Sequence, residues 1–353
     1  MIWLFIICAA VVAALLQRHW ADAALSSLHY DLRCRDVMVE VDEPATFVST
    51  IENRGRLPLL YVRLREFLPL DATVHGDEAW LSEHLEQRMA AWCVEDVFSL
   101  LPRRRRTTTL SVSFPRRGRY CPGSIEVTTG DFLGQHSATR IEFTFARTVV
   151  LPPRCEEPKL LHTLGGFMGD ISVRRFILED PVLTVGFREY TGREPMKAIS
   201  WPQSARLGRL VAKEYDHTTD LSVTVLLNAE GANPEQLEKC LSITRTVCEN
   251  LEKQGVPYDL RTNADLVGPM GLISHVSRGL GRRHLDTILY GLGSCGGRCT
   301  EGLEALVTRC RAAARSNHSY VVVTPPLSPL QKQTVDRLGG AAMTVLTGEE
   351  AQP

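Results

Sequence analysis

The pattern of apolar residues changes class about two thirds of the way along the chain, and this change constrains the fold more than any other feature. Residues 28–150 contain short alternating segments such as Val37–Asp42 and Ala45–Ile51, separated by turns. Short alternating strands with turns between them are typical of an antiparallel β-sandwich. From residue 221 onward, nearly continuous apolar strands alternate with helical stretches. This second pattern predicts a doubly wound, Rossmann-type α/β domain built on a parallel sheet.

The α/β prediction rests on the order of the elements in the last third of the chain. The expected strands are 221–227, 256–261, 320–324 and 343–346, and the expected helices are 234–254, 282–292, 300–315 and 328–338. Two segments outside this domain are less regular. Residues 160–180 read as a loop that contains glycines, and residues 78–101 have helical spacing in part. The second segment therefore predicts an insertion in the sandwich.

The length and charge of the chain limit its domain number and its partners. With 353 residues, and about 100–200 residues per domain, more than one domain is expected. Forty Lys and Arg residues nearly balance forty-one Asp and Glu residues, so a dedicated nucleic-acid binder is not expected. The expected parts are a membrane anchor helix in 1–27, a β-sandwich in 28–150, a linker with a polar segment in 151–220, and the α/β domain in 221–353.

The N-terminus carries an unbroken apolar run, Ile2–Leu16. As a helix this run is about 22 Å long, and the hydrocarbon core of a bilayer is about 30 Å thick. The amphipathic continuation supplies the remaining length, so an uncleaved transmembrane helix that contacts the bilayer through residues 2–20 is expected. A cleaved signal peptide is the alternative, because Ala21–Ala23 resembles a cleavage site.

The basic residues near this run indicate its orientation. Arg18, Arg33 and Arg35 all follow the apolar run, and no basic residue precedes it. By the positive-inside rule, a single-pass protein of the cell membrane with cytoplasmic C-terminal domains is expected. The ten scattered cysteines agree with this compartment, because a chain of this length builds a core without disulfides. Cys295 and Cys299 form the one close pair, either as reduced thiols or as a labile disulfide.

A polar segment, residues 185–215, precedes the α/β domain and is rich in paired ion-forming residues. Tyr190 and Trp201 are expected to anchor this segment against the α/β core, and its arginines are expected to form bidentate ion pairs with carboxylates. On this interpretation the segment is a hydrogen-bonded clamp between domains. A surface for a ligand or a partner protein is the alternative.

Four short motifs give this segment a family resemblance. They are Arg188-Glu-Tyr190, Ile199-Ser-Trp201, Ser204-Ala-Arg206 and Lys213-Glu214. In this order they resemble the hallmark of the bacterial domain-of-unknown-function 58 (DUF58) family. Gly192-Arg-Glu stands where that family has Gly-Asp, and Arg117-Gly-Arg-Tyr120 with Gly130–Gly134 resembles a second family motif. The candidate partner-binding or clamp residues are Arg188, Tyr190, Gly192, Trp201, Ser204, Ala205, Arg206, Lys213 and Glu214.

The resemblance implies a C-terminal domain similar to von Willebrand factor A domains and a MoxR-type AAA+ ATPase as partner. Such domains often hold a divalent cation through Asp-x-Ser-x-Ser at the end of the first strand, because hard cations need a cluster of oxygen ligands. At the matching place this chain has Asn228-Ala-Glu230-Gly-Ala232. Asn228 and Glu230 are therefore weak candidates for metal ligands, and no cofactor is expected.

Motifs of several enzyme classes are missing from the sequence. It contains no Gly-x-Ser-x-Gly elbow, no His-Glu-x-x-His and no Gly-x-x-x-x-Gly-Lys loop. The leading hypothesis is a membrane-anchored, non-enzymatic adaptor that binds a MoxR-type ATPase in envelope or complex assembly. The alternatives are a metal-dependent adhesion-type binder that uses Glu230, and a thiol-redox protein that uses Cys295 and Cys299.

Overall fold

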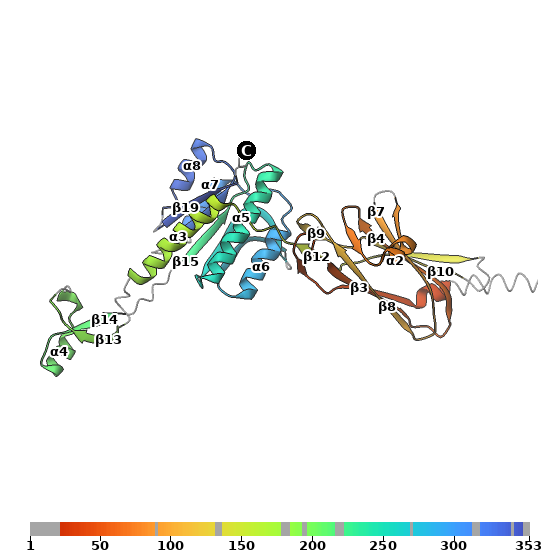
Figure 1. Ribbon diagram of the computed structural model, residues 1–353, viewed down its shortest axis with the longest axis horizontal. Helices are drawn as coiled ribbons and strands as arrows, with labels where there is room; N and C mark the ends of the chain where they lie inside the picture. The colour runs from red at the N-terminus through yellow and green to blue at the C-terminus, as the bar shows by residue number, and fades with distance from the viewer. Residues whose placement is uncertain are drawn as a thin grey trace, which may run out of the picture. The chain divides into compact units, whose positions relative to one another are not determined.

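The structure is a computed structural model, and it divides into two compact units (Figure 1). One unit extends to Pro153 and includes Leu292–Ser294, and the other contains Arg154–Gly291 and continues from Cys295. The residues that the structure describes are 22–88, 91–130, 136–177, 184–192, 196–215, 222–268, 271–312, 318–339 and 342–348.

Two antiparallel sheets dominate the first unit. The four-stranded sheet has the order β1 (Leu28–Cys34), β3 (Ala45–Asn53), β8 (Arg105–Ser113) and β5 (Thr73–His75). The five-stranded sheet has the order β11 (Ser137–Phe143), β10 (Ser124–Gly130), β4 (Leu59–Pro69), β7 (Ala91–Leu100) and β6 (Leu85–Arg88). A small third sheet joins β2 (Met38–Val39), β12 (Thr148–Val150) and β9 (Gly118–Tyr120), and helix α2 (Glu78–His84) precedes β6.

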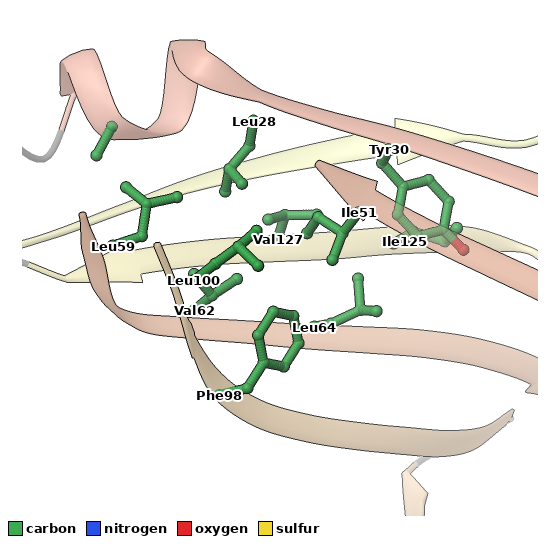
Figure 2. Packing of buried hydrophobic residues seen from close by; sticks show 11 residues of the cluster. Leu28, Tyr30, Ile51, Leu59, Val62, Leu64, Phe98, Leu100, Ile125 and Val127 are labelled. Carbon is green, nitrogen blue, oxygen red and sulfur yellow. The ribbon is translucent and has the colours of Figure 1, made fainter. Parts of the chain in front are cut away.

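The alternating sequence of the strands places one row of apolar side chains between the two sheets. Along β3 every second residue is buried, as expected for a strand with one face on a core. Figure 2 shows side chains from both sheets in one cluster, with Tyr30 and Ile51 from the four-stranded sheet and Val62 and Val127 from the five-stranded sheet. Each such side chain contributes about 1.5–3 kcal/mol on burial, so this shared core holds the two sheets together.

The second unit contains a five-stranded mixed sheet. Its order is β17 (Gly271–Gly279), β16 (Tyr258–Gly268), β15 (Ser222–Leu227), β18 (His318–Thr324) and β19 (Ala342–Thr347). All neighbours are parallel except β17, which pairs antiparallel with β16. The helices of this unit, besides the short α4 described below, are α3 (Pro158–Ile177), α5 (Pro234–Lys253), α6 (Arg282–Gly293, whose last two residues belong to the first unit), α7 (Leu303–Ala312) and α8 (Pro329–Asp336).

The helices bury apolar faces against this sheet. Helix α5 packs on β15 and β18 (Figure 1). Helices α7 and α8 share a core with Leu226, Tyr320 and Val322. The start of α5 is specified locally, because the Asn233 side chain accepts a hydrogen bond from Gln236 N at 2.7 Å in a capping box.

A short hairpin with a helix, which we call the hairpin lobe, contains the described residues 184–192 and 196–215. Strands β13 (Thr184–Glu189) and β14 (Val211–Tyr215) pair antiparallel. A 3₁₀ turn, η1 (Met196–Ala198), and helix α4 (Trp201–Leu207) lie between them in the chain. Helix α4 ends at Gly208, whose φ of 65° is the left-handed conformation that glycine adopts without strain.

The fold class predicted from the sequence is corrected at its first element, the transmembrane helix. No helix in the described part of the chain is long and apolar enough to cross a membrane. Helices α3 and α5 have 20 residues each, but both carry several charged side chains. The run Ile2–Leu16 and the proposed bilayer contact at 2–20 lie outside the described residues.

Other expected elements also differ from the structure. Residues 160–180, expected as a loop, lie largely in α3, and the strand expected at 256–261 continues to Gly268 before β17 returns beside it. The partly helical segment 78–101 is helical only in α2 and then forms β6 and β7. Strand β17 was not predicted because its sequence has no continuous apolar run, and most of its residues are exposed.

Candidate functional site

The weak metal candidate Asn228 lies in a closed hydrogen-bond network at the carboxyl edge of the sheet. Its side-chain oxygen accepts from Asn263 Nδ2 at 2.8 Å and from the backbone N–H of Glu230 at 3.1 Å. Its Nδ2 donates to Thr324 Oγ1 at 3.0 Å. Asn228, Asn263 and Thr324 are fully buried. Asn228 follows the last residue of β15, Asn263 lies within β16 just after the last residue paired with β15, and Thr324 ends β18. The network therefore ties three neighbouring strands together with neutral groups.

The second metal candidate, Glu230, stabilises a helix. Its Oε2 accepts a hydrogen bond from the backbone N–H of Leu303, the first residue of α7, at 2.5 Å. A carboxylate at a helix N-terminus satisfies an otherwise unpaired N–H and interacts favourably with the helix dipole. Among the described residues, no group of three or more His, Cys, Asp or Glu side chains is arranged to hold a metal ion. The divalent cation that the resemblance implies does not fit these residues, because the neutral Asn228 oxygen already accepts two hydrogen bonds and Glu230 Oε2 is bonded to the start of α7.

The two cysteines of the thiol hypothesis lie in different environments. Cys295 is buried, and its Sγ lies 3.6 Å from Oδ1 of Asp265. Cys299 is exposed, and its thiol donates to the carbonyl oxygen of Glu301 at 3.0 Å. Partial burial raises the pKa of the Cys299 thiol, which lowers the fraction of reactive thiolate at neutral pH. This environment does not activate the thiol.

The residues of the predicted hallmark all fall in the hairpin lobe. Ser204 on α4 is buried, and its Oγ accepts a hydrogen bond from the backbone N–H of Val211 at 3.0 Å. Gly192 has a φ of 83°, which explains glycine at that turn. Arg188, Ala205 and Arg206 are exposed, Tyr190 and Lys213 are half-buried, and Glu214 pairs with Gly186 across the hairpin.

The lobe has a small core of its own. Ala198, Ile199, Val211 and Ala212 are buried, and Ile199 forms a bridge to Ala212. Backbone hydrogen bonds from Ser200 N to Val211 O at 2.9 Å and from Tyr190 N to Leu210 O at 3.0 Å close the lobe. These contacts connect the residues between the two strands to β14 without the help of a large side chain.

The large apolar side chains of the lobe lie outside this core. Trp201, expected from the sequence to be an anchor, is 59% exposed. The exposed set consists of Phe187, Met196, Trp201, Leu207 and Leu210. Exposed apolar side chains gathered on a short segment mark an interaction surface more often than isolated ones do. The structure thus brings the hallmark residues together on one lobe and leaves its largest side chain uncovered.

A polar pocket of about 300 Å³, which sequence reasoning missed, lies in the α/β domain. Its lining residues are Ser222, Thr224, Asp259, Arg261, His275, Ser277, Arg278, Cys310 and His318. The available signal was the polar residues at the starts of apolar strands, such as Ser222 and His318. These residues are far apart in sequence, so only the strand order reveals that they meet.

Comparisons with known proteins do not add to this description. No protein-family model and no curated protein matches the chain. The CARDB domain of a Pyrococcus furiosus protein, solved in complex with di-metal ions, is 15% identical over 33% of this chain and 90% of that chain, with a TM-score of 0.20. Spo0M, a sporulation control protein from Bacillus subtilis, is 13% identical over 46% of this chain and 58% of that chain, with a TM-score of 0.19. Similarities this weak carry no argument about fold or function.

Proposed function

We propose that the chain is a non-enzymatic adaptor and that the hairpin lobe is its protein-binding surface. The observation that carries this proposal is the exposure of Trp201 and four other large apolar side chains on a lobe of about thirty residues. Tryptophan is among the residues most enriched at the energetic centres of protein interfaces. A solvent-exposed tryptophan on a lobe with other exposed apolar side chains is therefore suited to enter a pocket on a partner.

The charges of the lobe indicate the chemistry of that partner. Its described basic residues are Arg188, Lys197, Arg206, Arg209 and Lys213, and its described acidic residues are Glu189 and Glu214. One exposed ion pair, Arg209 Nη1 to Glu189 Oε1 at 3.5 Å, uses part of this charge. The surplus is positive, so the complementary surface combines apolar pockets with acidic residues. The resemblance to DUF58 proteins suggests a MoxR-type AAA+ ATPase as this partner.

The internal bonding of the lobe also favours a docking surface over a clamp. Its backbone hydrogen bonds and its small core, centred on Ile199 and Val211, lie within the lobe itself. A clamp is expected to bury its largest side chain, whereas Trp201 is exposed. No comparable feature in the described residues supports the metal-dependent or thiol-redox alternative.

The test is binding of the purified full chain to the MoxR-type AAA+ ATPase of the same organism, measured by biolayer interferometry. Trp201→Ala is expected to weaken binding about 30-fold, which corresponds to about 2 kcal/mol. Leu207→Ala is expected to weaken it less, by about fivefold. Leu330→Ala is the matched control, because Leu330 is a 71% exposed leucine on α8, outside the lobe.

Two results contradict the proposal. If the wild-type chain does not bind the ATPase, the partner is wrong. If Trp201→Ala and Leu330→Ala bind as tightly as the wild type, the lobe is not the binding surface.

A further inference from the structure

Five exposed arginines lie at one end of the β-sandwich, on or next to the two turns that connect its main sheets there. One turn follows β3, and the other precedes β8. We call this surface the basic end, and its arginines are Arg54, Arg56, Arg103, Arg104 and Arg105. The two turns are distant in sequence, so the fold brings their charges together.

A buried asparagine holds the two turns side by side. Asn53 is fully buried, and its Nδ2 donates to Leu57 O at 2.8 Å in the first turn and to Leu101 O at 3.3 Å in the second. The Asn53 backbone N–H donates to Arg104 O at 3.0 Å, and its Oδ1 accepts from Gly55 N at 2.9 Å. The arginines of the two turns therefore form one surface.

Most of the positive charge of the basic end is not compensated. Arg54 pairs with Glu52 at 2.8 Å, and Glu52 lies opposite Arg105 on β8. The other three arginines form no ion pair in the described part of the chain; they are Arg56, Arg103 and Arg104. The residues of this unit outside the described part contain one arginine and one aspartate, Arg18 and Asp131, so they do not change the balance.

The opposite end of the same strands has mixed charge. There the backbone N–H of Asp42 donates to Phe114 O just beyond β8, and the Tyr120 hydroxyl donates to Asp71 Oδ2 at 3.3 Å. The exposed charged residues of this opposite end include Asp42, Glu43, Asp71, Arg35, Arg116 and Arg119. Acids and bases balance there, whereas the basic end is dominated by one sign of charge.

The part of the chain that enters the sandwich beside the basic end indicates a lipid surface as the partner. Residues 22–27 are helical, Ala24 is buried in the sandwich core, and Ser27 O accepts from Arg54 N at 3.0 Å. In the sequence, five residues separate this helical turn from the uncharged apolar run Ile2–Leu16. Membrane affinity rises with apolar surface and with basic residues that meet anionic headgroups, and here both are adjacent.

The uncharged side chains of the basic end favour lipid over nucleic acid. Leu101 is 63% exposed beside the arginines, and Leu60 is 47% exposed at the start of β4. Exposed leucines among basic residues gain free energy at the boundary between headgroups and acyl chains. Residues 53–60 and 100–106 contain no aromatic residue on which the bases of a single strand could stack.

We propose that the basic end docks on a membrane surface that contains anionic phospholipid, with its arginines on headgroup phosphates and Leu101 in the interface. None of these residues belongs to the hairpin lobe, so the proposal does not depend on the protein-binding function. It gives the β-sandwich a partner of its own.

The experiment is cosedimentation of the purified full chain with two kinds of vesicle. One kind is phosphatidylcholine alone, and the other is phosphatidylcholine and phosphatidylglycerol at about 2:1. The ratio of the two partition coefficients isolates the electrostatic contribution, because the apolar run is present in both measurements. We expect a ratio well above one that falls as sodium chloride is added, since salt screens exposed charges.

Variants connect this ratio to the basic end. The triple variant Arg56→Gln, Arg103→Gln, Arg104→Gln is expected to lower the ratio about tenfold or more. Arg56→Gln alone is expected to lower it about fivefold, and it keeps the test valid if the triple variant does not fold. The matched control removes three exposed arginines from the opposite end and is expected to keep the wild-type ratio; it is Arg35→Gln, Arg116→Gln, Arg119→Gln.

Three results would overturn the proposal. The first is a ratio near one for the wild-type chain. The second is an equal fall in the ratio for the basic-end variants and the control. The third is binding to a DNA duplex that is tighter than binding to the anionic vesicles and is lost in the triple basic-end variant, which would assign the surface to nucleic acid.

Discussion

The hairpin lobe and the carboxyl edge of the α/β sheet are two regions where the sequence pointed to function, and they are built in opposite ways. At the carboxyl edge, Asn228 and Asn263 are fully buried, and their side chains are joined by a hydrogen bond. In the lobe, Trp201 and four other large apolar side chains are exposed, while the buried core consists of smaller residues. A position that matches a family motif is thus available to a partner only if its side chain is not already used within the fold.

The largest expected effect comes from breaking the closed network. Asn228→Ala removes one hydrogen-bond partner each from Asn263 Nδ2, Thr324 Oγ1 and the Glu230 N–H in a buried site. We expect a loss of about 3 kcal/mol in the free energy of unfolding, measured by urea denaturation. Asn250→Ala is the control, because half-buried Asn250 makes one side-chain hydrogen bond, to Thr246 O. Equal losses for the two variants would show that the network is not a structural unit.

A buried acid in the first unit gives a contrast to these neutral amides. Glu66 is buried and accepts a hydrogen bond from the Tyr30 hydroxyl at 2.7 Å, and burial raises the pKa of its carboxyl group. The folded state therefore favours the protonated form, and stability falls as the pH rises from the ordinary glutamate pKa through the raised value. The slope is about 1.4 kcal/mol per pH unit where only the unfolded state ionises.

Glu66→Gln should remove this slope, because the amide stays neutral and still accepts from Tyr30. Urea unfolding of both proteins between pH 4 and neutral pH measures the difference. Parallel stability curves for the variant and the wild type would show that Glu66 does not ionise differently on folding.

The smallest expected effect concerns Glu230 and the metal hypothesis. Glu230→Gln keeps an acceptor for the Leu303 N–H but loses the charge at the N-terminus of α7, so we expect a loss of about 0.5 kcal/mol. Magnesium, calcium and manganese are expected to leave the Tm of the wild type unchanged. A cation-dependent rise in Tm that Glu230→Gln abolishes would instead show a working metal site.

Sequence reasoning worked best where one segment carries its own signal. The helix expected at 234–254 corresponds to α5, because its apolar period and the Asn233 capping box are local. Helix α3 was missed because Gly165, Gly166 and Gly169 suggest a loop, although a Cβ at any of these positions would meet no atom within 4 Å, so close packing does not require glycine there. The expected transmembrane helix has no counterpart among the described residues.

The candidate sites were predictable only in part. The hallmark residues could be listed from the sequence, but the exposure of Trp201 depends on which side chains fill the core of the lobe. The engagement of Asn228 depends on Asn263 and Thr324, which belong to other strands. The pocket depends on strand order as well, since Ser222 and His318 are 96 residues apart. Contacts between strands that are distant in sequence cannot be predicted from a local sequence pattern.

The central claim, that the hairpin lobe is a protein-binding surface, is tested most directly by crosslinking mass spectrometry of the full chain with the MoxR-type ATPase. The account predicts intermolecular crosslinks from Lys197 and Lys213 in the lobe, and loss of these crosslinks in Trp201→Ala but not in Leu330→Ala. Crosslinks from these lysines only to other parts of the same chain would contradict it and would make the lobe a clamp within the protein.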